Sequence, residues 1–245
     1  MTIDLPGLVA RHRERALSGA LTLAVILALI AQTGGDAGWR AAALLSLLLA
    51  LASLVFFPAA MLRYRATTLL ADPDRRAFTT PPPPGPVLLA MAFTFILVPI
   101  IGEDVADLVR GEPWPDQPAG LMSGYALAAA WALSLGPWLR LRLQPGGLRY
   151  PTPFGSLTIP WEALDPESPV VPARSPLHGV RLAVTRPDLV RRRGLPPPAD
   201  RLPVPSVDPE YLGRVIRHYV THPERRPEIG SAAESARLAT VDIPG

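Results

Sequence analysis

Four long apolar runs without a charged side chain constrain the fold of this chain more than any other feature. A helix that crosses the roughly 30 Å hydrocarbon core of a bilayer needs about 20 apolar residues, and its backbone groups must pair within the helix. The second and fourth runs reach that length, and the other two approach it. The sequence therefore predicts a membrane region at 16–139 with four transmembrane helices, at 16–32, 41–62, 86–101 and 119–139.

The first run has a second interpretation. Three arginines precede it in the polar segment 1–15, and a basic start followed by an apolar core is typical of a cleaved signal peptide. Ala31-Gln32-Thr33 is a weak candidate for a cleavage site. Because three more apolar runs follow, we favour a retained helix over cleavage.

A proline-rich block, 81–86, precedes the third run. Such a block predicts a stiff, extended segment rather than a helix. Pro86 is the exception, because proline is well tolerated as the first residue of a helix. We therefore expect the third helix to start at Pro86 and to end at Ile101.

The arginines predict how these helices are oriented. They concentrate before the first run, between the second and third runs, and after the fourth, as Arg11, Arg13, Arg15, Arg63, Arg65, Arg75, Arg76, Arg140, Arg142 and Arg149. The other two connections carry only Arg40 and Arg110, and the second of them is acidic. Because cytoplasmic loops carry the excess of positive charge, we expect a multi-pass protein of the cell (inner) membrane with both termini in the cytoplasm.

The composition argues against several classes of protein. None of the four runs contains Asp, Glu, Arg or His, whereas ion pathways and membrane-buried hydrolases use ionisable groups at depth. The chain has no cysteine, which excludes disulfides and thiolate sites. No nucleophile–base pair, paired carboxylates or phosphate-binding loop is apparent. We therefore expect neither enzymatic activity nor a cofactor.

Small residues recur every fourth position along the last run, as Gly120, Gly124, Ala128, Ala132 and Gly136. Such a row lets two helices approach closely, either within one chain or between two copies. Alanine is frequent throughout this chain, so chance explains part of the pattern. The row remains a candidate packing seam, within the bundle or across a homodimer.

After residue 139 the periodicity of the sequence changes. Leucines at 139, 141 and 143 alternate with polar residues, which is typical of a strand with one buried face. Pro145-Gly146-Gly147 then predicts a turn. Further strands are expected at 148–151, 156–159, 180–185 and 201–205, and Trp161 is expected in the core.

A helix is expected to close this domain. Asp208 is a natural N-cap, and Pro209 suits the first helical position. Apolar residues then recur at helical spacing along 211–220, and this amphipathic face packs either over the sheet, which we favour, or on a membrane surface. The sequence thus predicts a small α+β domain at 140–222, an antiparallel sheet capped by this helix, and a disordered tail at 223–245.

These elements resemble the pleckstrin-homology-like (PH-like) domains of bacterial membrane proteins of actinobacterial type. The likeness covers 139–229 and is carried by Gly147-Leu148-Arg149-Tyr150, by IPWEAL at 159–164, and by the helix that begins at Asp208. It implies a domain that binds or scaffolds at a membrane. Phosphoinositide-binding members place basic residues at the first strand–strand turn, but Gln144-Pro145-Gly146-Gly147 stands there in this chain. The resemblance therefore does not extend to inositide binding.

Five arginines are the candidate contacts for anionic lipid headgroups or an acidic partner: Arg186, Arg191, Arg192, Arg193 and Arg201. A solvated loop is the competing interpretation. His218 and His222 stand four residues apart but have no apparent third ligand, so we expect no metal site. A dense basic face and a nucleic-acid-binding motif are both missing, so we expect no binding to nucleic acid.

Two hypotheses for function follow. In the first, a membrane protein presents a cytoplasmic PH-like domain for non-catalytic binding or scaffolding at the membrane surface. In the second, the chain is an accessory or regulatory subunit of a membrane transporter or secretion complex. A stoichiometric partner in purified material would favour the second hypothesis.

Overall fold

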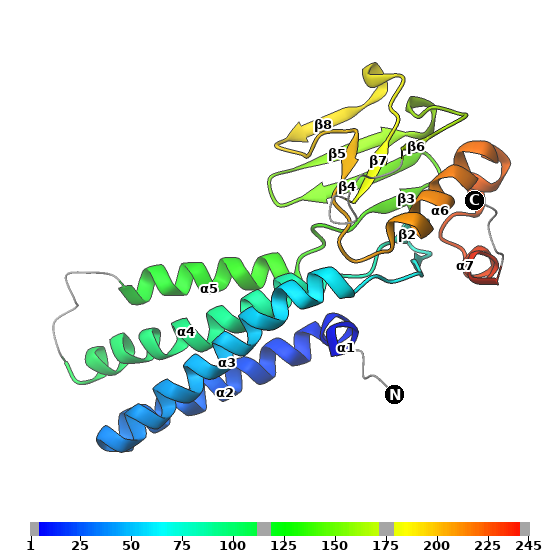
Figure 1. Ribbon diagram of the computed structural model, residues 1–245. Coiled ribbons are helices and arrows are strands. Elements are labelled where there is room, and N and C mark those ends of the chain that lie inside the picture. The colour runs from blue at the N-terminus through cyan, green and yellow to red at the C-terminus, as the bar shows by residue number, and fades with distance from the viewer. Residues whose placement is uncertain (1–4, 112–118, 172–178, 241–245) are drawn as a thin grey trace. The chain divides into compact units, whose positions relative to one another are not determined.

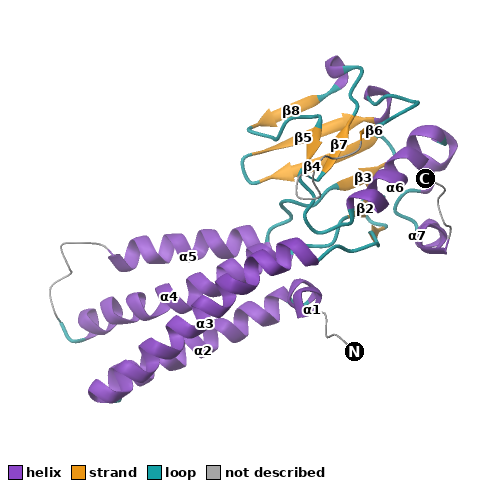
Figure 2. Cartoon of the chain, viewed as in Figure 1, coloured by secondary structure: helices purple, strands orange, loops and turns teal. Residues whose placement is uncertain are grey.

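The computed structural model describes residues 5–111, 119–171 and 179–240, so the two ends of the chain, 1–4 and 241–245, lie outside the described residues. The chain divides into two compact units (Figure 1, Figure 2). The helical unit comprises 1–61 and 84–136, and the sheet unit comprises 62–83 and 137–245. The predicted membrane region 16–139 therefore contains a segment, 62–83, that belongs to the sheet unit.

The helical unit contains five helices among its described residues. These are α1 (Leu5–Arg11), α2 (Arg13–Thr33), α3 (Gly35–Arg63), α4 (Pro84–Val109) and α5 (Ala119–Leu135). Three of them, α2, α3 and α4, are long and apolar enough to cross a membrane. Helix α5 is apolar but has 17 residues, a length of about 25 Å. The predicted fourth span, 119–139, is thus longer than its helix.

Helix α4 corrects the prediction for the proline-rich block. The helix begins at Pro84, two residues before the expected start, and extends to Val109, well past Ile101. Prolines in a first turn cost little because the N–H groups there have no partner within the helix. The block is therefore extended only up to Pro83, and the acidic residues that follow the third run are helical.

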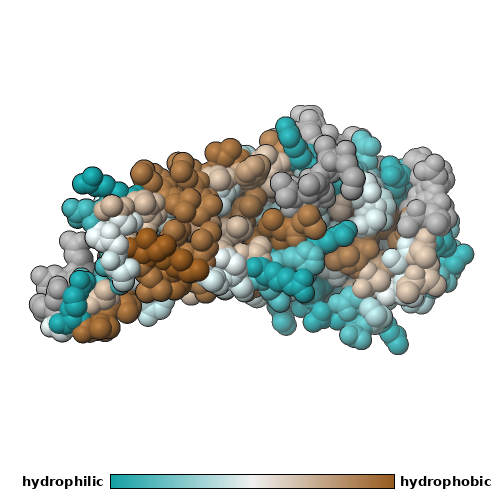
Figure 3. Space-filling model, turned by 90° about the horizontal axis from the view of Figure 1, so that it is seen from below, coloured by the Kyte–Doolittle hydropathy of each residue, from teal (hydrophilic) through white to brown (hydrophobic). Residues whose placement is uncertain are grey.

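Helix α4 is the centre of the helical unit, because α1, α2 and α5 all pack against it. Leu17 of α2 and Val87 and Ala90 of α4 are fully buried, and Trp131 of α5 packs against them. The Trp131 indole also donates to the Thr94 hydroxyl, at 3.0 Å. Large side chains instead point outward, including Leu44, Leu48, Val55 and Phe56. Figure 3 shows hydrophobic residues gathered over the middle of the helical unit, as expected of helices surrounded by lipid.

The sheet unit contains two antiparallel sheets among its described residues. One has six strands in the order β1-β2-β3-β4-β5-β8, with bounds Leu70–Asp72, Ala77–Thr79, Arg142–Gln144, Gly147–Thr152, Gly155–Pro160 and Arg191–Gly194. The other has three strands in the order β6-β7-β9, with bounds Val170–Val171, Val180–Leu182 and Arg201–Leu202. The strands expected at 148–151, 156–159, 180–185 and 201–205 are present, although the last two are shorter.

Strands β1 and β2 come from the segment between α3 and α4, in which no strand was predicted. Phe78 of β2 pairs with Leu143 of β3, and Thr79 pairs with Arg142. The chain therefore leaves the sheet at β2, passes through α4 and α5, and returns to the neighbouring strand. The domain boundary expected at residue 140 is corrected accordingly.

The core of the sheet unit lies between the two sheets and α6 (Pro209–Thr221). Trp161, in the 3₁₀-helix η1 (Trp161–Ala163), is buried as predicted and donates from its indole to the Gln144 carbonyl, at 2.9 Å. The predicted start of α6 is confirmed: the Asp208 carboxylate accepts from the Tyr211 N–H at 2.8 Å, and Pro209 is the first helical residue. The apolar face of α6 packs on the sheets, with Leu212, Val215 and Ile216 fully buried.

The residues after α6 are folded, which corrects the prediction of a disordered tail for 223–240. They form the 3₁₀-helix η4 (Pro223–Glu228) and the helix α7 (Ala232–Thr240). Ile229 and Leu238 are buried in the core of the sheet unit. Gly230 has φ +89° and lies against the backbone of Arg76 and Ala77, where a Cβ would collide. The small, polar composition of this segment concealed two anchoring apolar side chains.

Phe78 tests whether 62–83 is part of the sheet unit, because its ring is fully buried. Replacing a buried phenylalanine by alanine costs about 3–5 kcal/mol, so Phe78→Ala should lower the free energy of unfolding by that amount. The matched control is Phe154→Ala, since Phe154 is 75% exposed. The measurement is urea unfolding of the full chain in detergent, followed by near-ultraviolet circular dichroism. Equal losses for the two variants would contradict the pairing of β2 with β3.

Candidate functional site

A row of arginines crosses the outward face of the six-stranded sheet. Residues directly opposite in antiparallel strands share a face, and the register aligns Thr79, Arg142, Arg149, Thr158 and Arg191 across β2, β3, β4, β5 and β8. Arg193 lies on the same face, opposite Ser156. We call Arg142, Arg149, Arg191 and Arg193 the arginine row.

The local sequence places these side chains outward. Leu141, Leu143 and Leu148 are fully buried, so the period of two puts Arg142 and Arg149 on the opposite face. The tight connection at 145–146 sets the register in which Arg142 faces Arg149. Strand β8 then adds Arg191 and Arg193 at the edge of the sheet, and all four of its residues are exposed.

At Arg142, the nearby carboxylate of Asp72 offsets only part of the positive charge of the surrounding guanidinium groups. Partial burial, together with the nearby guanidinium groups of Arg75 and Arg149, lowers the pKa of Arg142 below its ordinary value. The neighbouring carboxylate, Asp72, is engaged by Arg75 at 2.9 Å, and this bond lowers the pKa of Asp72. No acidic side chain among the described residues forms an ion pair with a member of the row. Side-chain hydroxyls of Thr158 and Ser156 lie between its members, so the face is suited to an anion.

The structure brings together only part of the predicted arginine group. Arg191 and Arg193 join the row, whereas Arg192 lies opposite the buried Leu157 and so points to the other face. Arg201 lies in the three-stranded sheet beside Asp200, at 3.7 Å, and Arg186 precedes the 3₁₀-helix η3 (Pro187–Leu189). Residues 191–194 are a strand and not a loop. Arg142 and Arg149 were missing from the predicted group, although their alternation with leucines was a usable signal.

The predicted seam of small residues is only partly used within the chain. The Gly120 N–H donates to the Asp104 carboxylate of α4 at 2.7 Å, and a Cβ at Gly120 would overlap that carboxylate. A Cβ at Gly124 would have no neighbour within 4 Å, and Ala128 and Ala132 are exposed. Gly136 lies beyond the end of α5. A homodimer through the exposed part of the row stays a prediction.

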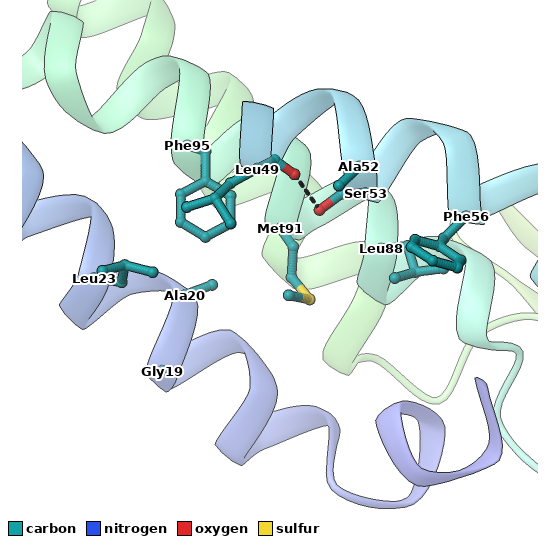
Figure 4. Close-up of a pocket in the computed structure, with 10 residues that line it drawn as sticks. All are labelled: Gly19, Ala20, Leu23, Leu49, Ala52, Ser53, Phe56, Leu88, Met91 and Phe95. Atoms are coloured by element: carbon teal, nitrogen blue, oxygen red, sulfur yellow. Dashed lines mark hydrogen bonds between the residues drawn. The ribbon is translucent and has the colours of Figure 1, made fainter. Parts of the chain in front are cut away.

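An apolar cavity of about 340 Å³ lies between α2, α3 and α4 of the helical unit (Figure 4). Leu23 of α2, Phe56 of α3 and Met91 of α4 are among the residues that line it. The hydroxyl in its wall, on Ser53, donates to the Leu49 carbonyl at 2.9 Å. The cavity therefore offers no free polar group and is suited to hydrocarbon alone.

His218 of α6 and His222, the C-cap residue of that helix, do not form a metal site with other described residues, among which no group of three metal-ligating side chains occurs. Their rings stack at 4.7 Å. His218 Nε2 lies 2.7 Å from the Arg237 guanidinium, so this nitrogen acts as an acceptor and His218 is neutral. Burial, and then the charge of Arg237, lowers the pKa of His218. The histidine thus belongs to the contact that holds α7.

That contact is a buried polar network. The Glu234 carboxylate, 2% exposed, accepts from the Tyr219 hydroxyl at 2.9 Å and from Arg237 at 2.6 Å. The bond from Arg237 is the main reason that the pKa of Glu234 is lowered. Every member has a partner, so the network fixes α7 against α6 without leaving a buried charge unpaired.

His218 makes the docking of α7 sensitive to acid. The pKa of His218 is lowered in the folded chain, so the unfolded chain binds a proton before the folded chain does as the pH falls below about 6.5. The stability that is present above that pH is therefore lost as the pH falls. We expect the melting temperature to fall between pH 7.5 and 5.5, where Glu234 remains ionised. In His218→Gln, which keeps an acceptor for Arg237, this fall should be smaller, whereas in the control His222→Gln it should persist. An unchanged pH profile in His218→Gln would refute the assignment.

No family model, no curated protein and no solved structure matches this chain. Among the described residues, the arginine row is the arrangement with the clearest chemical preference, and that preference is for an anion.

Proposed function

We propose that this chain is a multi-pass membrane protein, without catalytic activity, whose sheet unit binds anionic lipid headgroups through the arginine row. The observation that carries the proposal is the alignment of Arg142, Arg149 and Arg191 on one face, where none of them forms an ion pair with a described residue. Guanidinium groups bind phosphate oxygens with paired N–H donors, and they are favoured at anionic membrane surfaces.

The connectivity supports four spans with both termini on one side of the membrane, and the distribution of arginines favours the cytoplasm as that side. Strands β2 and β3 pair directly, so the segments before α4 and after α5 lie on one side of a membrane. The helix pair between them must then cross twice or not at all. Because α4 is long enough to cross, α5 is proposed as the fourth span, extended by the apolar residues that follow it. The packing of α2 against α4 supports a retained first helix.

We also propose that the sheet unit is a PH-like domain of the kind found in bacterial membrane proteins. Two antiparallel sheets with a closing amphipathic helix, α6, support this class. The resemblance covers only 139–229, whereas the sheet unit also contains β1 and β2, which come from 62–83. A fragment of 139–229 would lack both strands, so binding is best tested on the full chain.

Single cysteines test the topology, because the chain has none of its own. A membrane-impermeant maleimide applied to right-side-out vesicles should label Asp36→Cys and Val109→Cys. Both residues are exposed. Asp36 lies at the start of α3 and Val109 at the end of α4, which are the ends of these helices that do not connect to the sheet unit. Asp74→Cys and Glu224→Cys, also exposed, should be labelled only after the vesicles are opened. Labelling of Val109→Cys together with Asp74→Cys would refute the crossing of α4.

Two double variants with equal charge change test the arginine row. Arg149→Gln with Arg191→Gln removes two members of the row, whereas Arg192→Gln with Arg201→Gln removes two exposed arginines outside it. Hydrogen bonds to charged groups contribute about 1.5–3 kcal/mol each. The first pair should therefore weaken binding of short-chain phosphatidylglycerol at least about tenfold, and the second less than about twofold.

The measurement is calorimetric titration of the purified full chain in an uncharged detergent. Short-chain phosphatidylcholine is the control ligand and should bind weakly to every variant. Inorganic phosphate, added as a competitor, distinguishes a lipid from a soluble anion: effective competition at low concentration would favour the soluble anion. Equal losses in the two double variants would overturn the proposal, and a protein that co-purifies and depends on the row would favour the accessory-subunit hypothesis.

A further inference from the structure

A second cavity in the helical unit combines an apolar interior with polar side chains. It has a volume of about 400 Å³ and lies where α2 and α4 approach their C-terminal ends and α3 begins. Leu27, Ala42 and Ile100 contribute apolar walls, and Trp39, Ser46 and Glu103 contribute polar groups. Its size falls in the range of small-molecule sites, about 300–1,000 Å³.

The Ser46 hydroxyl is the first sign of a ligand. Ser46 is 6% exposed, and its oxygen has no hydrogen-bond partner among the described residues. Other hydroxyls in these helices are satisfied by the carbonyl four residues earlier: Ser53 donates to Leu49, and Thr94 donates to Ala90. A buried hydroxyl without a partner costs stability. A polar group of a bound molecule would remove that cost.

The charges around the cavity favour a cation. Glu103 makes no hydrogen bond or ion pair with a described residue, whereas Arg110, the basic side chain in the lining, is paired with Asp107. The C-terminal ends of α2 and α4 add partial negative charge, which the positive N-terminal end of α3 offsets in part. Trp39 is 53% exposed, and its indole ring can receive a cation on its face.

We propose that this cavity binds an amphiphile with an ammonium group. The apolar body lies between α2, α3 and α4, the ammonium group lies between the Glu103 carboxylate and the Trp39 ring, and the Ser46 hydroxyl bonds a polar atom of the bound molecule. This site is separate from the arginine row, which prefers the opposite charge, so failure of either proposal leaves the other intact.

Three probes that each carry a phenyl ring on a four-carbon chain test the site: 4-phenylbutylammonium, 4-phenylbutanol and 4-phenylbutyrate. Calorimetric titration of the full chain in an uncharged detergent should show saturable binding of the ammonium, at least about tenfold tighter than that of the alcohol. Titration of detergent alone corrects for partition into micelles. Tightest binding of the carboxylate, or equal and non-saturable uptake of all three probes, would overturn the proposal.

Variants locate the binding. Glu103→Gln should weaken the ammonium about tenfold and leave the alcohol unchanged, because only the charge is removed. Asp36→Asn is the matched control, since Asp36 lies near the same end of the unit but does not line the cavity. Ala43→Leu, at an exposed lining residue, should fill the cavity and abolish binding of both probes. Equal effects of Asp36→Asn and Glu103→Gln, or full binding by Ala43→Leu, would refute the site.

Discussion

The pairing of β2 with β3 is the contact on which the rest of this structure depends. Phe78 and Leu143 meet in the core although α4 and α5 lie between them in the sequence. Closing so long a loop is unfavourable for the unfolded chain, but the cost rises only slowly with length. The fully buried Phe78 ring offsets part of it. This one pairing ties both ends of a helix pair to one sheet, and in the proposed topology it determines which segments share a side of the bilayer.

Much of the fold follows from local signals. Apolar runs predicted the helices, because a bilayer demands length and hydrophobicity from each span independently. Asp208 and Pro209 predicted the start of α6 for similarly local reasons. Strands β1 and β2 had no such signal, since three residues are too few for a recognisable period and their partners are distant in sequence. The folded tail was missed because Ile229 and Leu238 are isolated apolar residues in a polar segment.

The candidate site likewise depends partly on local sequence and partly on contacts between segments that are distant in the sequence. The sequence run 191–193 suggested one basic cluster, but strand geometry sends Arg192 to the opposite face from its neighbours. Arg142 and Arg149 come from different strands and meet only through the register of the sheet. Register depends on which strands pair, and the position of β8 beside β5 cannot be read from local composition. The arginine row is therefore a property of the topology, and the charged cavity of the helical unit likewise depends on three helices meeting.

The discontinuous origin of the sheet unit has a consequence for synthesis. Strands β1 and β2 leave the ribosome before α4 and α5, and β3 follows only after both helices. At about 5–20 residues per second this interval is on the order of several seconds. Throughout it the β1–β2 hairpin is an isolated pair with an open edge, which is marginally stable and prone to pair wrongly. The hairpin can meet its partner strand only after α4 and α5 have been synthesised, so the synthesis of these two helices limits how soon the sheet unit can fold.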